Sequence, residues 1–543
     1  MKKSITAFLL VIVSFVQAQT PVKPTKPKLV VGIMVDQMRW DYLYRFQERY
    51  GEGGFKRLLG EGFSCENTFM PFTPTYTAAG HASVYTGSVP SLNGILGNNW
   101  FNRYTNQYVY CTDDSTVKTV GSSSAAGEMS PRNMIANTIT DELRLSTNFR
   151  SKTIGIALKD RGAILPAGHA ANAAYWFDDA SGGWISSTYY MQSLPKWMTQ
   201  LNAKKLPESY MAKSWKTLYP IETYVQSTAD AKPYEGAIPG EDNTFEHRTD
   251  TIKGARSAAF RVSPYGNTFT FDAAKAAIEG ESLGGRGITD FLAVSFSSPD
   301  YIGHTFGPNS IEVEDMYLRL DKDMADFLSY LDTKLGEGQY LLFLTADHAV
   351  AHVPGFAWEN KLPAGLSNST AMQRSLNEAL VKIHGQGVYI QSIINYQVFL
   401  NRETLQAKNL DRNLVKRQVI DILLTLPGVE KALDLENIPA AGLPKQVEMM
   451  VVNGYHQKYS GDVQFVYRPQ WFEGGSRGTT HGSWNPYDSH IPLLWYGWSI
   501  KQGQSNREVY MTDIAPTVAA LLQIQMPNAT IGKVIEEVRK SLD

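Results

Sequence analysis

Cysteine is scarce in this chain of 543 residues, which contains only Cys65 and Cys111. Two thiols cannot build a four-cysteine metal site or a disulfide-rich scaffold. Internal repeats and low-complexity segments are also missing, so neither a repeat array nor a disordered chain is indicated. The 43% hydrophobic and 19% charged residues are instead typical of a globular protein with a large core.

A strong net charge is missing as well. Lysine and arginine number 51 against 53 aspartates and glutamates, which gives a formal net charge of -2. A field this weak excludes attraction of a nucleic acid duplex or an anionic membrane by bulk charge. Any attraction for an anion must therefore be local.

The chain has no apolar run of roughly 18 residues, the length that a membrane helix needs. A shorter apolar stretch, residues 5–16, follows Lys2 and Lys3 and ends just before small residues around Ala18. This pattern predicts a secretory signal peptide over residues 1–18. We therefore expect the mature chain to be periplasmic or secreted and to have no membrane span.

Export would place both cysteines in an oxidising compartment, where disulfides persist. We therefore expect a disulfide between Cys65 and Cys111. The alternative is two separately buried thiols, because cysteine packs well as a small hydrophobic residue.

Short apolar runs, each followed by charged or polar residues, predict buried strands. They cover residues 29–35, 153–158, 291–296 and 340–346. Continuous apolar runs are typical of parallel strands that are covered on both faces. Between the last two runs, residues 311–335 carry apolar side chains at helical spacing. The predicted fold class is α/β, a doubly wound and mostly parallel sheet with helices on both faces.

Two stretches interrupt this strand-helix pattern. Residues 172–285 are rich in tryptophan, tyrosine, glycine and serine without a clear period, and we expect an insertion over the active-site face. Residues 355–478 contain alternating strand-like pieces around a helix at about 410–426, which indicates a small α+β cap. The discontinuous core then consists of residues 19–171, 286–354 and 479–543.

Acidic and histidine residues follow the ends of the predicted strands. Asp36 follows the first strand, and Asp347 and His348 follow the last. Asp300 and His304 are four residues apart, so on a helix they share one face. Ligands bind beyond the carboxyl ends of the strands in such sheets. Several carboxylates in one cleft need cations, and nitrogen and oxygen donors without a thiolate suit zinc, with manganese or another divalent ion as alternatives.

Thr77 lies in a segment of small residues, 73–87, that is typical of a turn leading into a helix. The free backbone N–H groups at a helix start favour an anionic substrate, and a hydroxyl bound there to a metal is an activated nucleophile. The alternative for this threonine is a plain helix cap. We expect His81 and His352 at most to support the site without binding metal. His169 and His490 are left unassigned.

In chain order, these residues resemble the two-zinc core of the alkaline phosphatase superfamily. The resemblance rests on Asp36, Thr77, Asp300, His304, Asp347, His348 and His481. A threonine nucleophile is similar to the nucleotide pyrophosphatase/phosphodiesterases and to the PafA-type bacterial alkaline phosphatases. The resemblance implies one Zn²⁺ at Asp300, His304 and His481, and a second Zn²⁺ at Asp36, Asp347, His348 and the Thr77 oxygen.

Asn98, Lys159 and Arg161 resemble the phosphate-binding residues of the PafA-type enzymes. A phosphate monoester is a dianion with three unsubstituted oxygens, so additional cations and donors stabilise it and its transition state. The resemblance therefore implies an alkaline phosphatase that acts on small phosphate monoesters through a phosphothreonine intermediate. No base-reading or sugar-reading element is recognisable, so we expect broad specificity, and we expect a monomer. The alternatives are a phosphodiesterase or nucleotide pyrophosphatase on the same core, and a binding protein that has kept the fold without the activity.

Overall fold

One large sheet forms the centre of the molecule, which a computed structural model describes over residues 26–539. The predicted signal peptide, residues 1–18, lies outside the described residues. The sheet has 11 strands. In spatial order ten of them are β17 (His490–Ile491), β2 (Phe63–Phe69), β18 (Leu493–Gly497), β10 (Tyr340–Thr345), β1 (Leu29–Val35), β9 (Asp290–Phe296), β6 (Thr153–Ala157), β7 (Ala173–Asp178), β8 (Gly183–Ser187) and β5 (Thr119–Val120), and β19 (Gly503–Tyr510) pairs with β2.

The middle of this sheet is parallel. β10, β1, β9, β6 and β7 pair in parallel, whereas β18 and β8 run antiparallel to their neighbours β10 and β7. In the register, Val31 of β1 is opposite Leu342 on one side and Leu292 on the other. Every residue of β1 is buried, as expected for a strand covered on both faces. The predicted α/β fold class is confirmed.

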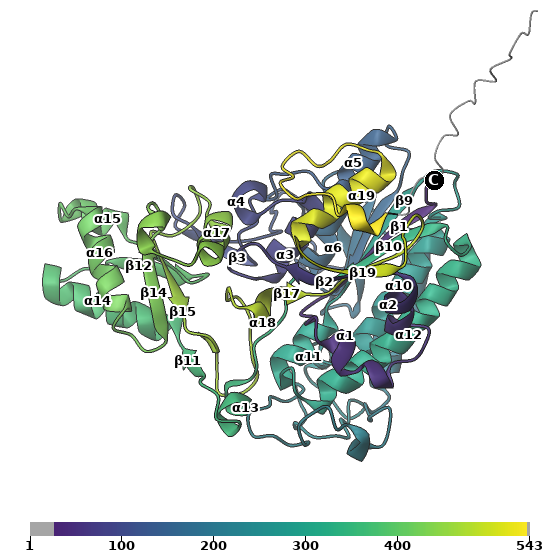
Figure 1. Cartoon of the computed structure of the whole chain (residues 1–543), viewed down its shortest axis with the longest axis horizontal. Coiled ribbons are helices and arrows are strands. Elements are labelled where there is room, and N and C mark those ends of the chain that lie inside the picture. The colour runs from purple at the N-terminus through teal and green to yellow at the C-terminus, as the bar shows by residue number, and fades with distance from the viewer. Residues whose placement is uncertain (1–25, 540–543) are drawn as a thin grey trace, which may run out of the picture.

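Helices cover both faces of the sheet (Figure 1). One face is covered by α2 (Phe55–Glu61), α10 (Tyr265–Glu281) and α12 (Ile311–Leu335), and the other by α3 (Thr77–Thr86), α5 (Ile139–Ser146), α6 (Asp160–Ala167) and α19 (Ile514–Leu522). The predicted helix over 311–335 is confirmed, and it ends at Gly336, whose φ of 100° favours glycine. Within residues 26–539, none of the helices combines the length and the apolar character that crossing a bilayer requires.

A second lobe lies beside the large sheet and is drawn in green in Figure 1. Its sheet has the order β12 (Ile390–Ile394), β13 (Gln397–Leu400), β15 (Val463–Tyr467) and β14 (Val429–Asp434). The helices α14 (Ser369–His384) and α16 (Arg412–Leu423) pack on this sheet and share a hydrophobic core with it. We call this lobe the cap.

One segment of the cap differs from the expectation. Residues 449–454 look strand-like in the sequence, but they belong to the helix α17 (Lys445–Gly454). Its buried residues Val447, Met450, Val451 and Gly454 recur every three or four positions, which is the period of a helix.

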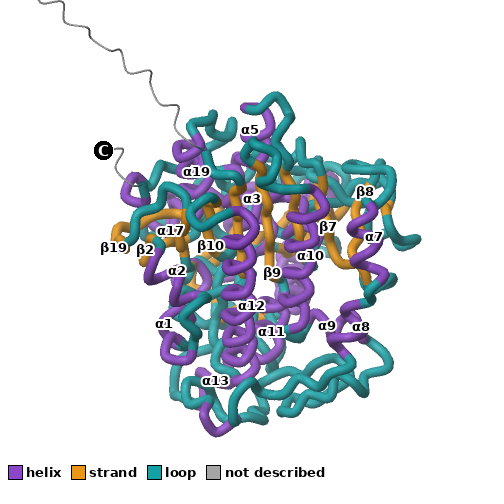
Figure 2. Tube along the Cα trace, turned by 90° about the vertical axis from the view of Figure 1, so that its right-hand side faces the viewer, coloured by secondary structure: helices purple, strands orange, loops and turns teal. Residues whose placement is uncertain are grey.

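The segment expected as an insertion, residues 172–285, begins and ends in the main fold. Its first strands, β7 and β8, extend the large sheet, and its last helix, α10, packs against β9 and α12. Between them lie long loops and the short helices α7 (Lys196–Ala203), α8 (Leu206–Met211) and α9 (Arg256–Arg261), which Figure 2 shows beside and below the sheet.

The two cysteines are free and buried, so the expected disulfide is wrong. Cys65 lies on β2 in the main hydrophobic core, whereas Cys111 packs with Trp100 and Leu165 in a separate cluster. Each thiol fills an apolar position as a small hydrophobic side chain. Burial raises the pKa of both thiols to about 12.

Candidate active site

The carboxyl ends of four adjacent parallel strands gather the predicted site residues. Asp36 follows β1, Asp347 follows β10, and Lys159 follows β6. Asp300 lies in α11 (Ser298–Phe306), the helix that follows β9. Because β10, β1, β9 and β6 are neighbours in the sheet, these side chains meet at one edge.

Asp36, Asp347 and His348 form the first cluster, in which one ligand atom of each residue lies within 4.8 Å of the others. All three side chains are fully buried. Asp36 Oδ1 and Asp347 Oδ2 have no hydrogen-bond partner, and they lie 3.4 and 3.5 Å from His348 Nε2. The Thr77 hydroxyl oxygen is 3.3 Å from the same nitrogen. Buried carboxylate oxygens without partners are costly, and a metal ion would satisfy them.

Asp300, His304 and His481 form the second cluster. Asp300 Oδ1 lies 3.1 Å from His304 Nε2 and 3.7 Å from His481 Nε2. Asp300 and His304 share one face of α11, whereas His481 belongs to the segment that returns from the cap. The two clusters adjoin, because the rings of His348 and His481 stack with their centroids 3.4 Å apart.

The three imidazoles are held in the same way. In each, Nδ1 lies within hydrogen-bond distance of a backbone carbonyl oxygen, which can only accept, so Nδ1 carries the proton. The distances are 3.0 Å from His348 to Ala349, 2.8 Å from His304 to Thr479 and 2.6 Å from His481 to Thr75. Each Nε2 therefore presents its lone pair to its cluster, the orientation that metal-ligating histidines adopt.

Charges within the site perturb one another strongly. Burial, followed by the charge of Asp347, raises the pKa of Asp36 well above its usual value. Burial alone would also raise the pKa of Asp300, but the charges of His304 and Lys159 outweigh it and hold this pKa well below its usual value. Burial also lowers the pKa of His481, and the neighbouring His348 and His304 lower it further. A site of this kind favours a bound cation.

Lys159 links the two clusters. It caps the N-terminus of α6, and its Nζ lies 2.7 Å from Asp36 Oδ2 and 2.5 Å from Asp300 Oδ2. Burial works against the charged form, but Asp300 and Asp36 raise the pKa of Lys159. The ammonium group is therefore charged and lies between the two candidate metal positions.

Arg161 and Asn98 lie at the rim of the same site. Arg161 Nη1 donates to the Tyr110 hydroxyl at 3.1 Å, and its buried Nε has no hydrogen-bond partner. Asn98 Oδ1 accepts a 2.9 Å hydrogen bond from the backbone N–H of Ala78, the residue after Thr77. The structure thus brings Asn98 next to Thr77, and Lys159 and Arg161 to one helix start.

Thr77 is the first residue of α3, so it lies at the positive end of that helix. The preceding Tyr76 is extended, with φ −117° and ψ 154°. His81, one turn later, lies with Nδ1 2.8 Å from the Thr77 carbonyl oxygen and 3.3 Å from Asp347 Oδ2. Its Nε2 is 2.8 Å from the Ser295 hydroxyl, so His81 connects α3 to two strand ends.

Gln37 was not found by sequence reasoning, although it touches both clusters. Its backbone N–H donates to Asp347 Oδ1 at 3.2 Å, and its side-chain amide donates to Asp300 Oδ1 at 2.7 Å. It is buried and has a φ of 67°, a conformation uncommon for glutamine. Nothing in the residue type indicates this role, since the backbone conformation depends on the packing around it.

The cap also reaches the site, through Tyr396 in the turn between β12 and β13. Its hydroxyl lies 3.4 Å from the His481 carbonyl oxygen, and its ring stacks with Tyr76 at a centroid distance of 6.4 Å. The neighbouring Asn395 donates to the Asn99 carbonyl oxygen at 2.8 Å. The cap therefore contacts the N-terminal end of α3 and the segment that carries His481.

The remaining candidate histidines lie outside the two clusters. His169 is near Asp141 and the Met134 carbonyl oxygen, His352 is near Asn309 Oδ1, and His490 is near the Glu66 carbonyl oxygen.

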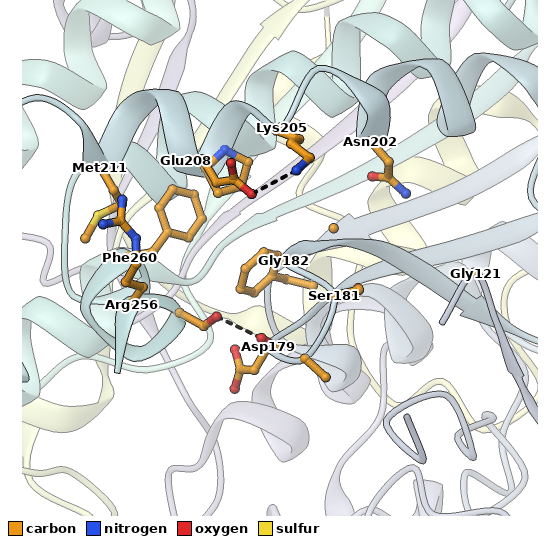
Figure 3. A pocket seen from close by; sticks show the side chains of 15 residues that line it. Gly121, Asp179, Ser181, Gly182, Asn202, Lys205, Glu208, Met211, Arg256 and Phe260 are labelled. Atoms are coloured by element: carbon orange, nitrogen blue, oxygen red, sulfur yellow. Dashed lines mark hydrogen bonds and ion pairs between the residues drawn. The ribbon is translucent and has the colours of Figure 1, made fainter. Parts of the chain in front are cut away.

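A cavity of about 380 Å³ lies between the β7–β8 turn and the helices α8 and α9 (Figure 3). Phe260 and Met211 form part of its wall, and Lys205 and Glu208 pair across one side. It lies apart from the two clusters, and only its rim approaches them. Asp179 pairs with Arg261, whose Nη1 donates to the Tyr301 hydroxyl at 2.8 Å, and Lys159 lies over the Tyr301 ring.

Known proteins resemble this chain over nearly its whole length. The family model for type I phosphodiesterase / nucleotide pyrophosphatase matches residues 30–489. The alkaline phosphatase PhoV of Synechococcus elongatus is 53% identical over 96% of this chain and 94% of its own length. A Myroides odoratus protein named calcium-transporting ATPase is 51% identical over 95% of both chains.

A solved structure agrees with these sequence matches. The alkaline phosphatase PafA of Elizabethkingia meningoseptica is 47% identical over 98% of both chains. Its crystal structure superimposes on this one with a TM-score of 0.93, covering 95% of this chain and all of the PafA chain.

Proposed function

The chain belongs to the type I phosphodiesterase / nucleotide pyrophosphatase family, and from this we propose that it is an exported, monomeric alkaline phosphatase acting on phosphate monoesters. One observation carries the proposal. A threonine hydroxyl at a helix N-terminus lies 3.3 Å from His348 of one cluster of metal-ligand type, a second such cluster adjoins the first, and Lys159 lies between the two. The relatives named alkaline phosphatases, at 47% and 53% identity, support the same activity.

The donor set suits two zinc ions. Asp300, His304 and His481 would hold one, and Asp36, Asp347, His348 and the Thr77 oxygen would hold the other. Three nitrogen donors, three carboxylates and no thiolate are the ligands that zinc takes in hydrolytic sites. When bound, the two ions would supply Lewis-acid charge that activates the hydroxyl and stabilises the leaving oxygen.

In the proposed reaction, the Thr77 oxygen attacks phosphorus as its proton leaves, and the bond from phosphorus to the alcohol oxygen breaks. The alcohol leaves, and a phosphothreonine forms. Water then breaks the bond between phosphorus and the threonine oxygen, which releases inorganic phosphate and restores the hydroxyl. The helix start of α3 presents backbone N–H groups to the anion throughout.

Lys159, Arg161 and Asn98 favour a monoester over a diester. A transferred phosphoryl group with three unsubstituted oxygens has more negative charge to stabilise than one that carries a second substituent. Asn98 contacts the residue after Thr77, Lys159 lies between the two clusters, and Arg161 follows Lys159 by two residues in the first turn of α6, which supports this preference. The terminal phosphoryl group of a nucleoside triphosphate is of the same kind, which suits the ATPase name of the Myroides relative.

The test compares kcat/KM for p-nitrophenyl phosphate with that for a p-nitrophenyl phosphodiester. Lys159→Ala and Arg161→Ala should each lower monoester turnover by roughly 10²-fold or more, the usual size of a lost transition-state contact. Diester turnover should fall less. Lys196→Ala, at an exposed lysine of α7, is the matched control and should change neither activity.

A wild-type preference for the diester would contradict the proposal. Equal losses for the two substrates in Lys159→Ala and Arg161→Ala would show that these side chains do not contact the phosphoryl oxygens.

A further inference from the structure

A third group of metal-ligand type lies in the long loop between residues 224 and 255. One ligand atom each of Glu241, Asp242 and His247 lies within 4.8 Å of the others. We call these three residues the His247 cluster. None of them belongs to the two clusters beside Thr77.

His247 is the best-defined member. It is fully buried, and its backbone N–H and C=O both pair with Trp215, at 3.1 and 2.9 Å. Its Nε2 lies 3.2 Å from Glu312 Oε1, whereas its buried Nδ1 has no hydrogen-bond partner. A buried ring nitrogen without a partner is rare in native proteins, and a neutral imidazole nitrogen is a common metal ligand.

The surroundings of the His247 cluster are strongly acidic. Glu312 and Glu235 are almost fully buried, and Asp230 lies close enough to act on the charge of His247. Burial, followed by the charge of Glu312, raises the pKa of Glu235 to about 9. Within residues 26–539, the structure gives none of these five carboxylates an ion pair with a lysine or arginine. One of them, Glu312, pairs with the imidazole of His247. No lysine or arginine therefore stabilises these carboxylates, and burial favours the protonated form of Glu235 and Glu312.

We propose that Glu241, Asp242 and His247 bind a third divalent cation, separate from the catalytic ions. The mixed carboxylate and imidazole donors favour a transition metal such as Mn²⁺ or Zn²⁺ over Ca²⁺, which takes oxygen ligands. Glu312 and Asp230 lie near His247, and a bound cation would favour their ionised form over the protonated form that burial favours.

The bound cation would fix the loop against the segments that carry the second catalytic cluster. Next to Glu235, the Gly236 backbone N–H donates to the Thr305 carbonyl oxygen at 2.7 Å, directly after His304. The Tyr234 carbonyl oxygen accepts from Gly478 at 2.9 Å, three residues before His481. The role of this cation is thus to hold the loop in place, outside the chemical step.

The test counts bound metal in the full chain by elemental analysis after dialysis against chelator-buffered Mn²⁺. The double variant Glu241→Gln/Asp242→Asn should bind one equivalent less than wild type. This difference does not depend on how many ions the clusters near Thr77 hold, so the outcome is independent of the proposed function. Glu222→Gln, at an exposed carboxylate in the same region, is the control and should bind as wild type does.

Thermal unfolding gives a second readout, in which the double variant and wild type should respond differently to EDTA and to Mn²⁺. With EDTA present, the double variant should be at least as stable as wild type, because carboxylate repulsion is removed. With Mn²⁺ present, wild type should gain more in Tm than the double variant. Equal metal content and equal Tm gains in the two proteins would overturn the proposal.

His247→Gln tests the imidazole donor. It should weaken binding of the third Mn²⁺ by at least roughly tenfold. If the third equivalent binds equally well to His247→Gln and wild type, or if only Ca²⁺ binds and does so equally in both, His247 is not a ligand and the assignment is overturned.

Discussion

At the scale of single residues, Gln37 shows how one residue can connect two candidate metal-binding clusters. Its backbone N–H and its side-chain amide reach different carboxylates, Asp347 and Asp300. Both donors depend on the left-handed conformation of this residue. Hydrogen bonds to the ligand carboxylates set their orientation and charge, so Gln37 should influence how tightly metal is held.

Gln37→Ala should therefore lower metal affinity by about 10- to 100-fold, the usual cost of removing such a support. Competition with a chelator measures the change. Gln523→Ala is a close control, because Gln523 is also a glutamine in the left-handed region, with a φ of 51°, but is exposed at the end of α19. Equal affinities in the two variants would mean that the Gln37 amide does not act on the ligands.

The buried carboxyl group of Asp323, outside the two clusters, should make the free energy of unfolding depend on pH. Burial, followed by the charge of Asp272, raises its pKa to about 6 from the ordinary 3.8. Between those two values the folded state binds more protons than the unfolded state, so this group lowers stability as the pH rises from about 4 to about 6.

Asp323→Asn should remove that contribution, since the amide oxygen can still accept the hydrogen bond from the Thr268 hydroxyl. The variant should lose less free energy of unfolding than wild type across this window. The difference is at most about 1.4 kcal/mol per pH unit. Urea unfolding at fixed metal concentration measures it, and parallel pH profiles would contradict the assignment.

At the scale of elements, the placement of α3 depends on its small residues. All ten residues of α3 are buried. A Cβ atom at Gly80 would overlap the backbone carbonyl oxygen of Asp347. Glycine at this position therefore allows α3 to lie directly against the strand end that precedes Asp347 and His348.

Gly80→Ala should push α3 away from Asp347 and destabilise the protein by about 1–3 kcal/mol, the usual cost of overpacking. Activity should fall with it. Gly60→Ala is the matched control, because Gly60 lies in the helix α2 with open space around its Cβ position. There alanine should stabilise by up to about 1 kcal/mol. Urea unfolding of both variants decides, and a Gly80→Ala protein as stable as wild type would contradict the close contact.

The sequence predicts the strands and helices near the site better than any other part of the molecule. Residues 29–35 and 311–335 coincide with β1 and α12, because their burial patterns follow directly from apolar spacing. Asp36, Asp347 and His348 could then be placed together from the general geometry of parallel sheets.

Features that depend on distant contacts could not be predicted in the same way. The left-handed Gln37, the approach of Tyr396 to His481 and the grouping around His247 each join segments far apart in the chain. α17 was missed because its apolar run also fits a strand. The two cysteines lie in separate clusters, and residue counting cannot show that separation.

At the scale of the whole molecule, bound metal should contribute to stability as well as to activity. The buried carboxylates Asp36, Asp300 and Asp347 lie in the segments that follow three different strands, and cations would hold these segments together. A ligand present at 100 times its Kd stabilises the folded state by about 2.7 kcal/mol.

EDTA should accordingly lower the Tm of the wild-type protein and abolish monoester hydrolysis, and added Zn²⁺ should restore both. Differential scanning calorimetry and p-nitrophenyl phosphate hydrolysis on the same samples measure the two effects. A Tm and an activity that EDTA leaves unchanged would contradict metal binding at the two clusters.

The position of the cap along the chain also determines the order in which the residues of the two clusters are synthesised. Asp36, Asp347 and His348 are all present once residue 348 has been synthesised, but the other cluster waits for His481, 133 residues later and beyond the whole cap. At a synthesis rate of about 5–20 residues per second, this interval lasts roughly 7–27 s. A newly made chain therefore contains all residues of the first candidate cluster well before those of the second, and the whole cap is synthesised before the two clusters can come together.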